Sequence, residues 1–183
     1  MTTQARPVMT TFTHRVLGAA LLDAHVYEEV EADGRATRQA VALVLLAGVA
    51  GGIGLRGFGA VQNLVAGVIA ALVGWMAWAT LTYLIGTRLL PEPQTRADIG
   101  ELLRTLAFAS APGLLRALGV IPFLGVPIYA IASVWMLVAM IVAVRQALDY
   151  TSTGRAVAVC VVGWALSLVF AAIIGILFAS SVS

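Results

Sequence analysis

Apolar residues fall into four long runs along the chain, and arginine or other polar residues bound each run. The runs cover residues 40–55, 64–86, 128–144 and 156–179. A membrane-spanning helix needs roughly 20 mostly apolar residues. Each run, extended by its flanking residues, is therefore predicted to be a transmembrane helix, and we place these spans near residues 38–56, 64–87, 124–146 and 156–179.

A fifth segment, residues 102–119 with the sequence LLRTLAFASAPGLLRALG, is shorter and carries an arginine near each end. As one helix it would be roughly 27 Å long, close to the thickness of the hydrocarbon core. Arg104 and Arg116 can extend toward the two membrane surfaces while the apolar middle stays in lipid. Pro112 is tolerable in such a helix where a neighbour such as Ser110 satisfies the freed carbonyl. We predict a short span; the alternative, a segment lying in the membrane interface, stays open.

The distribution of arginine favours five spans over four. With five spans, nine arginines lie on the side of the N-terminus, against Arg56 and Arg116 on the other side. With four spans, the division is eight against three. Cytoplasmic segments of membrane proteins carry the excess of basic residues. We therefore expect an N-terminus in the cytoplasm and a C-terminus outside.

The first 34 residues predict a short amphipathic cytoplasmic segment, separate from the membrane domain of residues 35–183. Asp23 either interrupts its helical pattern or caps a second short helix. Its acidic residues predict a position at the level of the lipid headgroups. At helical spacing, the apolar residues of this segment that fall on one face are Phe12, Val16, Ala19, Ala20, Val26, Tyr27 and Val30.

A helix start is also predicted after residue 98, because Asp98 and Glu101 have the spacing of a capping box for the helix that follows.

Composition agrees with this reading. The chain is 61% hydrophobic and 11% charged, whereas a soluble domain is about 25% charged. Its side chains cannot cover a water-facing surface, so the sequence predicts an all-α integral membrane protein. A net charge of +2 argues against a nucleic-acid partner. All eleven basic residues are arginine, and with so much alanine and valine this is typical of a GC-rich genome, which suggests a bacterial cytoplasmic membrane.

No residue pattern predicts catalysis, a metal site or a cofactor. His14 and His25 lie outside any metal-ligand spacing, and Cys160 has no second cysteine to pair with. The four long runs contain no Asp, Glu, Lys or His, the groups that usually mark proton or ion pathways in membranes. We therefore expect the protein not to be an enzyme.

Small residues carry a clearer signal. Gly48 and Gly52 form a GxxxG pattern in the first span. Such a pattern lets two helices approach closely. Packing inside the bundle and contact between two copies of the chain both fit the pattern.

Several stretches resemble the Yip-type membrane domain, the family of Ypt/Rab-interacting proteins, in its short bacterial form. The resemblance covers roughly residues 12–170, and its most specific part is the FASAP element followed by the IPxLG turn. The stretches that carry it are LLDAHVYEEVEAD, LTYLIGTRLL, ELLRTLAFASAPGLLRALGVIPFLG and VWMLVAMIVAVRQAL.

The resemblance implies a compact bundle of about five helices with a cytoplasmic N-terminus. Eukaryotic relatives act in vesicle trafficking and membrane shaping, with Rab-type GTPases as partners. Their partner-binding cytosolic tail is not matched here, apart from an echo of an Asp/Tyr motif at Asp23 and Tyr27. A GTPase partner is therefore not carried over to this chain, and neither is any catalytic residue.

Our leading hypothesis is a non-enzymatic membrane protein that acts as a scaffold, an accessory subunit or a membrane-organising factor. Its expected partners are the lipid bilayer and either another membrane protein or a second copy of the chain. The alternative is a small transporter or channel with a polar path near Ser110, Pro112 and Arg116. The candidate positions for interaction or structure are Asp23, Tyr27, Arg104, Ser110, Pro112 and Arg116, with Gly48 and Gly52 for helix packing.

Overall fold

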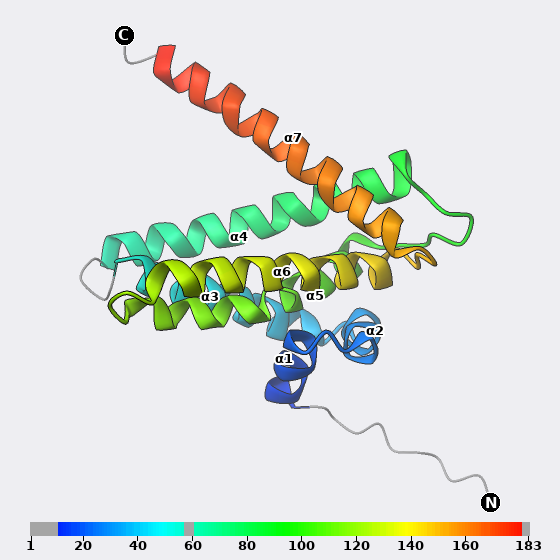
Figure 1. Cartoon of the computed structure of the whole chain (residues 1–183). Helices are drawn as coiled ribbons and strands as arrows, with labels where there is room; N and C mark the ends of the chain where they lie inside the picture. The colour runs from blue at the N-terminus through cyan, green and yellow to red at the C-terminus, as the bar shows by residue number, and fades with distance from the viewer. Residues whose placement is uncertain (1–10, 57–60, 181–183) are drawn as a thin grey trace, which may run out of the picture.

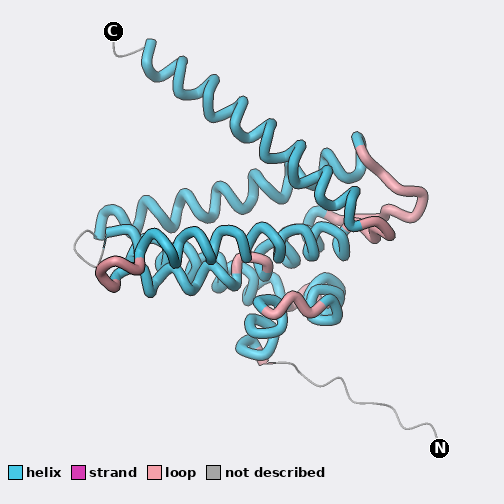
Figure 2. Tube along the Cα trace, viewed as in Figure 1, coloured by secondary structure: helices cyan, strands magenta, loops and turns pink. Residues whose placement is uncertain are grey.

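The computed structural model describes residues 11–56 and 61–180, and every regular element in these ranges is a helix (Figures 1 and 2). Two short helices, α1 (Phe12–Ala20) and α2 (Ala24–Ala32), come first. The four predicted long spans correspond to α3 (Ala36–Arg56), α4 (Val61–Leu84), α6 (Gly125–Ala147) and α7 (Thr153–Ser180). Between α4 and α6 lie the π-helical turn η1 (Ile85–Leu89), α5 (Ile99–Phe108) and the 3-10 helix η2 (Ala111–Val120).

Three of these helical segments are long and apolar enough to cross a membrane: Ala36–Gly54, Gly67–Leu89 and Gly125–Ala147. In α7, Thr153–Val169 forms a shorter apolar helix. The predicted all-α class and the apolar character of these helices are thus confirmed.

The chain runs back and forth between two ends of a bundle. Helices α3 and α4 are antiparallel neighbours, and a Cβ atom added at Gly48 would lie 3.0 Å from the Cβ of Ala71. Together α5 and η2 run beside α3 in the same direction, because α5 contacts α2 just before α3 and Gly119 of η2 lies against Gly54. Helix α6 returns along η2 and α5, and α7 starts beside α6 and then diverges from the bundle (Figure 1).

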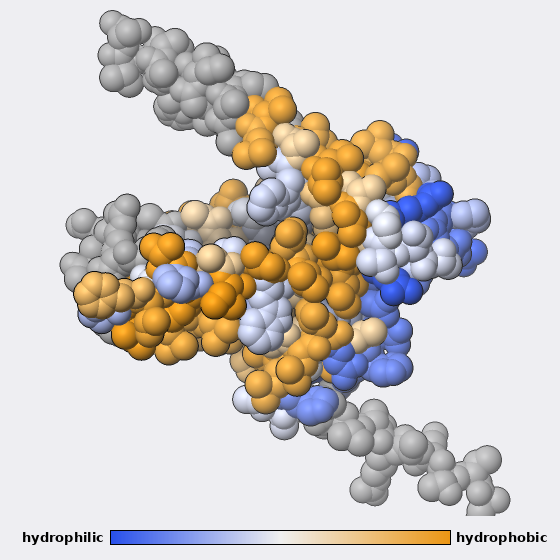
Figure 3. All heavy atoms as spheres, in the orientation of Figure 1, coloured by the Kyte–Doolittle hydropathy of each residue, from blue (hydrophilic) through white to orange (hydrophobic). Residues whose placement is uncertain are grey.

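The two ends differ in polarity. We call residues 28–35, 89–98 and 145–155 the polar end, and residues 53–54 and 117–125 the turn end. Hydrophilic residues gather at the polar end, on the right of Figure 3, while α6 presents a mostly hydrophobic surface toward the turn end. This division suits a bundle whose polar end lies at a membrane surface.

The segment 102–119 is not one continuous helix, which corrects the prediction. Helix α5 ends at Phe108, and η2 begins at Ala111 with Pro112 in its first turn. A proline ring clashes with the carbonyl group four residues earlier, and that carbonyl belongs to Phe108. The two pieces still add up to roughly 35 Å, from the rise per residue of each helix type, enough to match the hydrocarbon core.

Helices α1 and α2 fold against the bundle, and the hydrophobic core continues across the sequence boundary at residue 34. The side chains of Ala19, Val26, Tyr27 and Val30 are almost fully buried in this core. The indole Nε1 of Trp135 in α6 donates to the carbonyl of Ala20 at 2.8 Å. These contacts fix the N-terminal helices to the side of α5 and α6.

The predicted caps are present. Asp23 is both the break between α1 and α2 and the N-cap of α2, accepting a hydrogen bond from the backbone N–H of His25 at 3.0 Å. At α5 the capping box is complete: the Asp98 carboxylate accepts from Gly100 N–H at 2.9 Å, and Glu101 accepts from Asp98 N–H at 2.8 Å. These side chains satisfy helix N–H groups that lack an intrahelical partner.

Candidate functional site

A cavity of about 580 Å³ lies in the bundle and is lined by residues of α3, α4, α5, η2 and α6. That volume is within the range of small-molecule sites in proteins. Glycine residues of α3 and α4 leave part of this space unfilled. A Cβ atom added at Gly67 or Gly74 of α4 would meet no atom within 4 Å, so the space above them is open. The glycines that line the cavity are Gly48, Gly51, Gly52, Gly67 and Gly74.

The two GxxxG residues have separate environments within the bundle. Gly48 brings α3 against α4, where a Cβ would contact Ala71 at 3.0 Å. Gly52, one turn later, lines the cavity. Packing inside the bundle therefore accounts for the small residue at position 48.

Arg116 is the charged residue in the cavity lining. Its Nη2 donates to the hydroxyl of Ser133 at 3.0 Å, and its Cζ lies 5.0 Å from the centre of the Tyr129 ring. This is a cation–π geometry. The Tyr129 hydroxyl in turn donates to the carbonyl of Gly51 at 2.6 Å. The ring is thereby fixed between α6 and α3, and it supports the guanidinium from one side.

The Nε of Arg116 is buried and has no hydrogen-bond partner within the described residues. The same holds for the indole Nε1 of Trp78, which also lines the cavity. Its neighbour Trp75 is satisfied, since its Nε1 donates to the carbonyl of Leu103 at 2.9 Å. Buried polar groups are usually paired, so the two unpaired donors are the chemically distinctive feature of this cavity.

Of the sequence-predicted positions, Ser110, Arg116, Gly48 and Gly52 meet at the cavity. Ser110 is internally satisfied, because its hydroxyl donates to the carbonyl of Ala107 at 2.6 Å. Pro112 is fully buried and is absent from the cavity lining.

The remaining predicted positions lie around the N-terminal helices. Arg104 bonds to backbone carbonyls at the end of α2. Tyr27 is buried and donates its hydroxyl to the carbonyl of Ala19 at 3.0 Å, and burial raises the pKa of this phenol. Asp23 caps α2 and is exposed. In this structure Arg104 and Tyr27 connect helices to one another, and Asp23 caps one helix.

Sequence reasoning missed Tyr129, Gly67, Gly74 and Trp78 as cavity residues. A usable signal was present in α4, where Gly67, Ala71, Gly74 and Trp78 follow each other at spacings of three and four residues. Such a stripe places small residues and one large aromatic ring on the same helical face.

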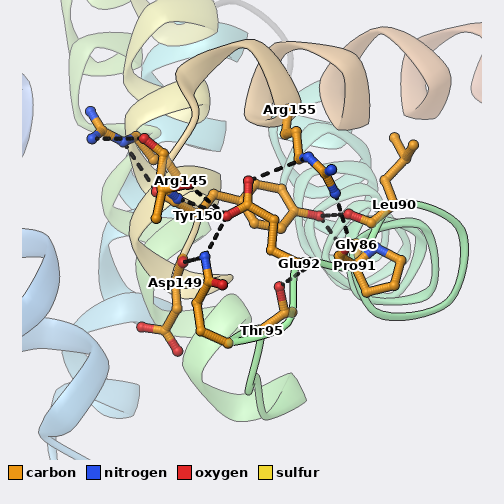
Figure 4. Close-up of polar contacts among 11 residues, drawn as sticks. Gly86, Leu90, Pro91, Glu92, Thr95, Arg145, Asp149, Tyr150 and Arg155 are labelled. Carbon is orange, nitrogen blue, oxygen red and sulfur yellow. Dashed lines mark hydrogen bonds and ion pairs between the residues drawn. The ribbon is translucent and has the colours of Figure 1, made fainter.

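A polar network at the polar end connects the loop before α5 to the start of α7 (Figure 4). The Glu92 carboxylate accepts from the N–H of Thr151 at 3.1 Å and from its hydroxyl at 2.9 Å, and pairs with Arg155 at 3.4 Å. The Thr151 N–H is the main cause that holds the pKa of Glu92 below its ordinary value. The Tyr150 hydroxyl donates toward the carbonyls of Leu90, at 2.8 Å, and Gly86, at 3.1 Å. This network positions the first turn of α7.

A polar pocket lies nearby and is lined by Glu28, Glu31, Arg145, Gln146, Asp149 and Tyr150. Burial, together with the surrounding carboxylates, raises the pKa of Glu31 to about 7. No group of three His, Cys, Asp or Glu suited to a metal ion occurs in the described part of the chain.

The chain was compared with models of protein families. The family model of the Yip1 domain matches residues 23–175, from the cap of α2 to the second half of α7. Neither curated protein sequences nor solved structures gave a match.

Proposed function

Because this chain belongs to the Yip1 domain family, we propose that it is a non-enzymatic integral membrane protein that holds or organises other membrane proteins. The family assignment and the apolar helices support its place in a membrane. Its role is that of a scaffold or accessory subunit, and its partner is a second membrane protein or another copy of the chain.

The proposed topology has five crossings in a bacterial cytoplasmic membrane, with the N-terminus in the cytoplasm. The path of the chain supports it, since each of α3, α4, the α5–η2 pair and α6 leads from one end of the bundle to the other. Arginine is concentrated at the polar end, which is then the cytoplasmic end. Helix α7 starts at that end and supplies the fifth crossing.

The position of α7 is the observation that carries the scaffold proposal. Its first turns contact α6, η1 and α4, and it then leaves the bundle (Figure 1). Large apolar side chains along it are exposed, with Val161 at 61%, Trp164 at 55% and Leu168 at 67%. A helix that is apolar all round and separated from its own bundle offers a surface to a helix of another chain.

Photo-crosslinking in native membranes tests this role. We would place p-benzoylphenylalanine at Trp164 of α7 and, as a matched control, at Val134 of α6, which is 64% exposed. The expected result is a discrete protein adduct from position 164 and only lipid adducts from position 134, with mass spectrometry identifying the partner. Lipid adducts alone at both positions would overturn the scaffold role.

A second candidate function is a small transporter or channel. It is supported by the placement of Ser110 and Arg116 in the lining of one cavity, next to the helix break at Pro112. The rate of solute uptake into proteoliposomes tests this function. It is compared between the wild-type chain and the Arg116→Ala variant. Loss of a measurable flux in a variant that keeps its helical content and melting temperature would establish transport. Equal flux in both proteins would exclude a path through Arg116.

A further inference from the structure

The cavity lined by α4 and α6 contains a charged hydrogen-bond donor without an acceptor. Arg116 Nε is buried and unpaired within the described residues. No carboxylate forms an ion pair with Arg116 anywhere in residues 11–56 or 61–180. A ligand that complements this site therefore brings hydrogen-bond acceptors and negative charge to Arg116.

The rest of the cavity has the opposite character. From Gly67 to Trp78 it follows α4 for about 16 Å at the helical rise, and open space lies above both Gly67 and Gly74. Its other wall is formed by the flexible apolar side chains of Met136 and Met140. A compact anion would leave this apolar length unfilled, whereas a hydrocarbon chain matches it.

Helices α4 and α6 lie on two sides of the cavity and make no extended contact with each other. With the bundle inserted in a membrane, the gap between these two helices faces lipid. At the far end, Gly163 of α7 lies against the ring of Trp78, so α7 covers that end. A lipid molecule can therefore enter sideways between α4 and α6.

We propose that this cavity binds one anionic phospholipid, with its phosphate at Arg116 and an acyl chain along the glycines of α4 toward Trp78. Arginine suits a phosphate because its planar guanidinium donates several hydrogen bonds in a fixed geometry. Tyr129 holds that guanidinium in place from below. The proposal requires insertion in a membrane, and it stands independently of both the scaffold role and the transport role.

Native mass spectrometry of the full chain in detergent tests the proposal. The chain is incubated with palmitoyl-oleoyl phosphatidylglycerol, with the phosphatidylcholine of the same acyl chains, or with inorganic phosphate. We expect a single phosphatidylglycerol adduct that survives higher collision energy than the phosphatidylcholine adduct, and no retained phosphate. Equal retention of the two lipids would overturn the anionic preference. Retention of inorganic phosphate, with no lipid adduct, would show that the cavity binds a small anion and overturn the lipid proposal.

Two variants separate the headgroup from the acyl chain. Arg116→Gln should weaken phosphatidylglycerol binding about tenfold, the value of one charge-assisted hydrogen bond. It should weaken phosphatidylcholine binding less, because the choline cation already opposes Arg116; Arg88→Gln, at an exposed position, is the control. Gly74→Leu should abolish binding of both lipids, because leucine occupies the open space while favouring the helix. Its control is Val73→Leu, on the exposed side of the same helix.

The Gly74→Leu variant decides the proposal even where Arg116→Gln does not fold. Undiminished phosphatidylglycerol binding by a folded Gly74→Leu protein would place the lipid elsewhere and overturn the assignment. The crosslinking experiment at Trp164 probes the surface of α7, whereas the lipid variants probe the cavity. Failure of the scaffold role can therefore be distinguished from failure of the lipid site.

Discussion

Arg104 bonds to the C-terminal end of α2 across 74 positions of sequence, its Nε donating to the carbonyl of Val30 at 3.1 Å. Its Nη2 donates to the carbonyl of Glu31. The last carbonyls of a helix have no partner inside the helix and carry a partial negative charge. The guanidinium therefore caps α2 from α5, and it attaches the N-terminal helices to the bundle.

Replacing Arg104 with alanine should detach α2 from α5. We expect the free energy of unfolding to fall by about 2 kcal/mol, because charge-assisted hydrogen bonds are lost and two helix carbonyls are left without a donor. Arg104→Lys should recover only part of this, since an ammonium group cannot span both carbonyls as a guanidinium does. Thermal unfolding in detergent and amide hydrogen exchange over residues 12–32 would measure the effect.

The control for this prediction is Arg96→Ala, which removes an exposed arginine from the preceding loop. It should change neither the melting temperature nor the exchange rates. Exchange in α2 that stays as slow in Arg104→Ala as in the wild type would show that other contacts hold the N-terminal helices.

Stability should depend on pH through Glu31. Burial, and then Glu101, Asp149 and Glu28, raise its pKa from 4.5 to about 7, against the opposing charge of Arg104. Between these two pKa values the folded protein keeps a proton that the unfolded chain releases. The free energy of unfolding therefore decreases as the pH rises through this window. The change is on the order of 1 kcal/mol, because solvent screens a half-exposed carboxylate.

Glu31→Gln tests this directly, because it keeps the backbone carbonyl that accepts from Arg104 and removes only the charge. The variant should melt at a higher temperature than the wild type at pH 8, and at nearly the same temperature at pH 5, where the wild-type carboxyl is protonated. A stabilisation that is equal at both pH values would point to packing and exclude titration of Glu31.

The helices and caps could be predicted because their signals are local. Helix α6 follows from one apolar run that ends at Arg145, and the cap of α5 follows from two acidic residues at fixed spacing. The cavity has no such local signal. Its polar groups come from Arg116, Tyr129 and Trp78, on three separate elements, and only the packed bundle brings them to one space.

The periodicity of apolar residues also could not predict the change from the α-helix α5 to the 3-10 helix η2. Apolar spacing continues across Pro112, so hydropathy alone predicts one helix over residues 102–119. The proline marks the break, but the 3-10 form of η2 goes with its close approach to α3. At this contact a Cβ atom added to Gly54 would lie 1.8 Å from the carbonyl oxygen of Arg116.

That contact predicts opposite effects for two glycine-to-alanine substitutions. Gly54→Ala forces a methyl group into the backbone of η2 and should cost at least about 3 kcal/mol of unfolding free energy. Gly74→Ala adds a methyl group where no atom lies within 4 Å, and it should gain up to about 1 kcal/mol from helix propensity. Melting temperatures of the two purified variants measure the difference. A Gly54→Ala protein as stable as the wild type would mean that η2 does not approach α3 so closely.

Accessibility of introduced cysteines should establish the direction of the bundle. The best positions are Gln94 at the polar end, which is exposed, and Phe123 at the turn end, which is 98% exposed. Gly119 is a poorer choice, since its Cβ would lie 2.9 Å from the carbonyl oxygen of Gly54. The native Cys160 is buried and should stay unlabelled.

With five crossings and a cytoplasmic N-terminus, a membrane-impermeant maleimide added to intact cells should label Phe123→Cys. Gln94→Cys should react only after the membrane is permeabilised, because α5 and η2 would separate the two positions by the full thickness of the bilayer. Labelling of both positions from outside, or of neither before permeabilisation, would place them on one side and reduce the α5–η2 pair to a segment that does not cross. Labelling of Gln94→Cys alone would instead keep the crossing and reverse the orientation, with the arginine-rich end outside.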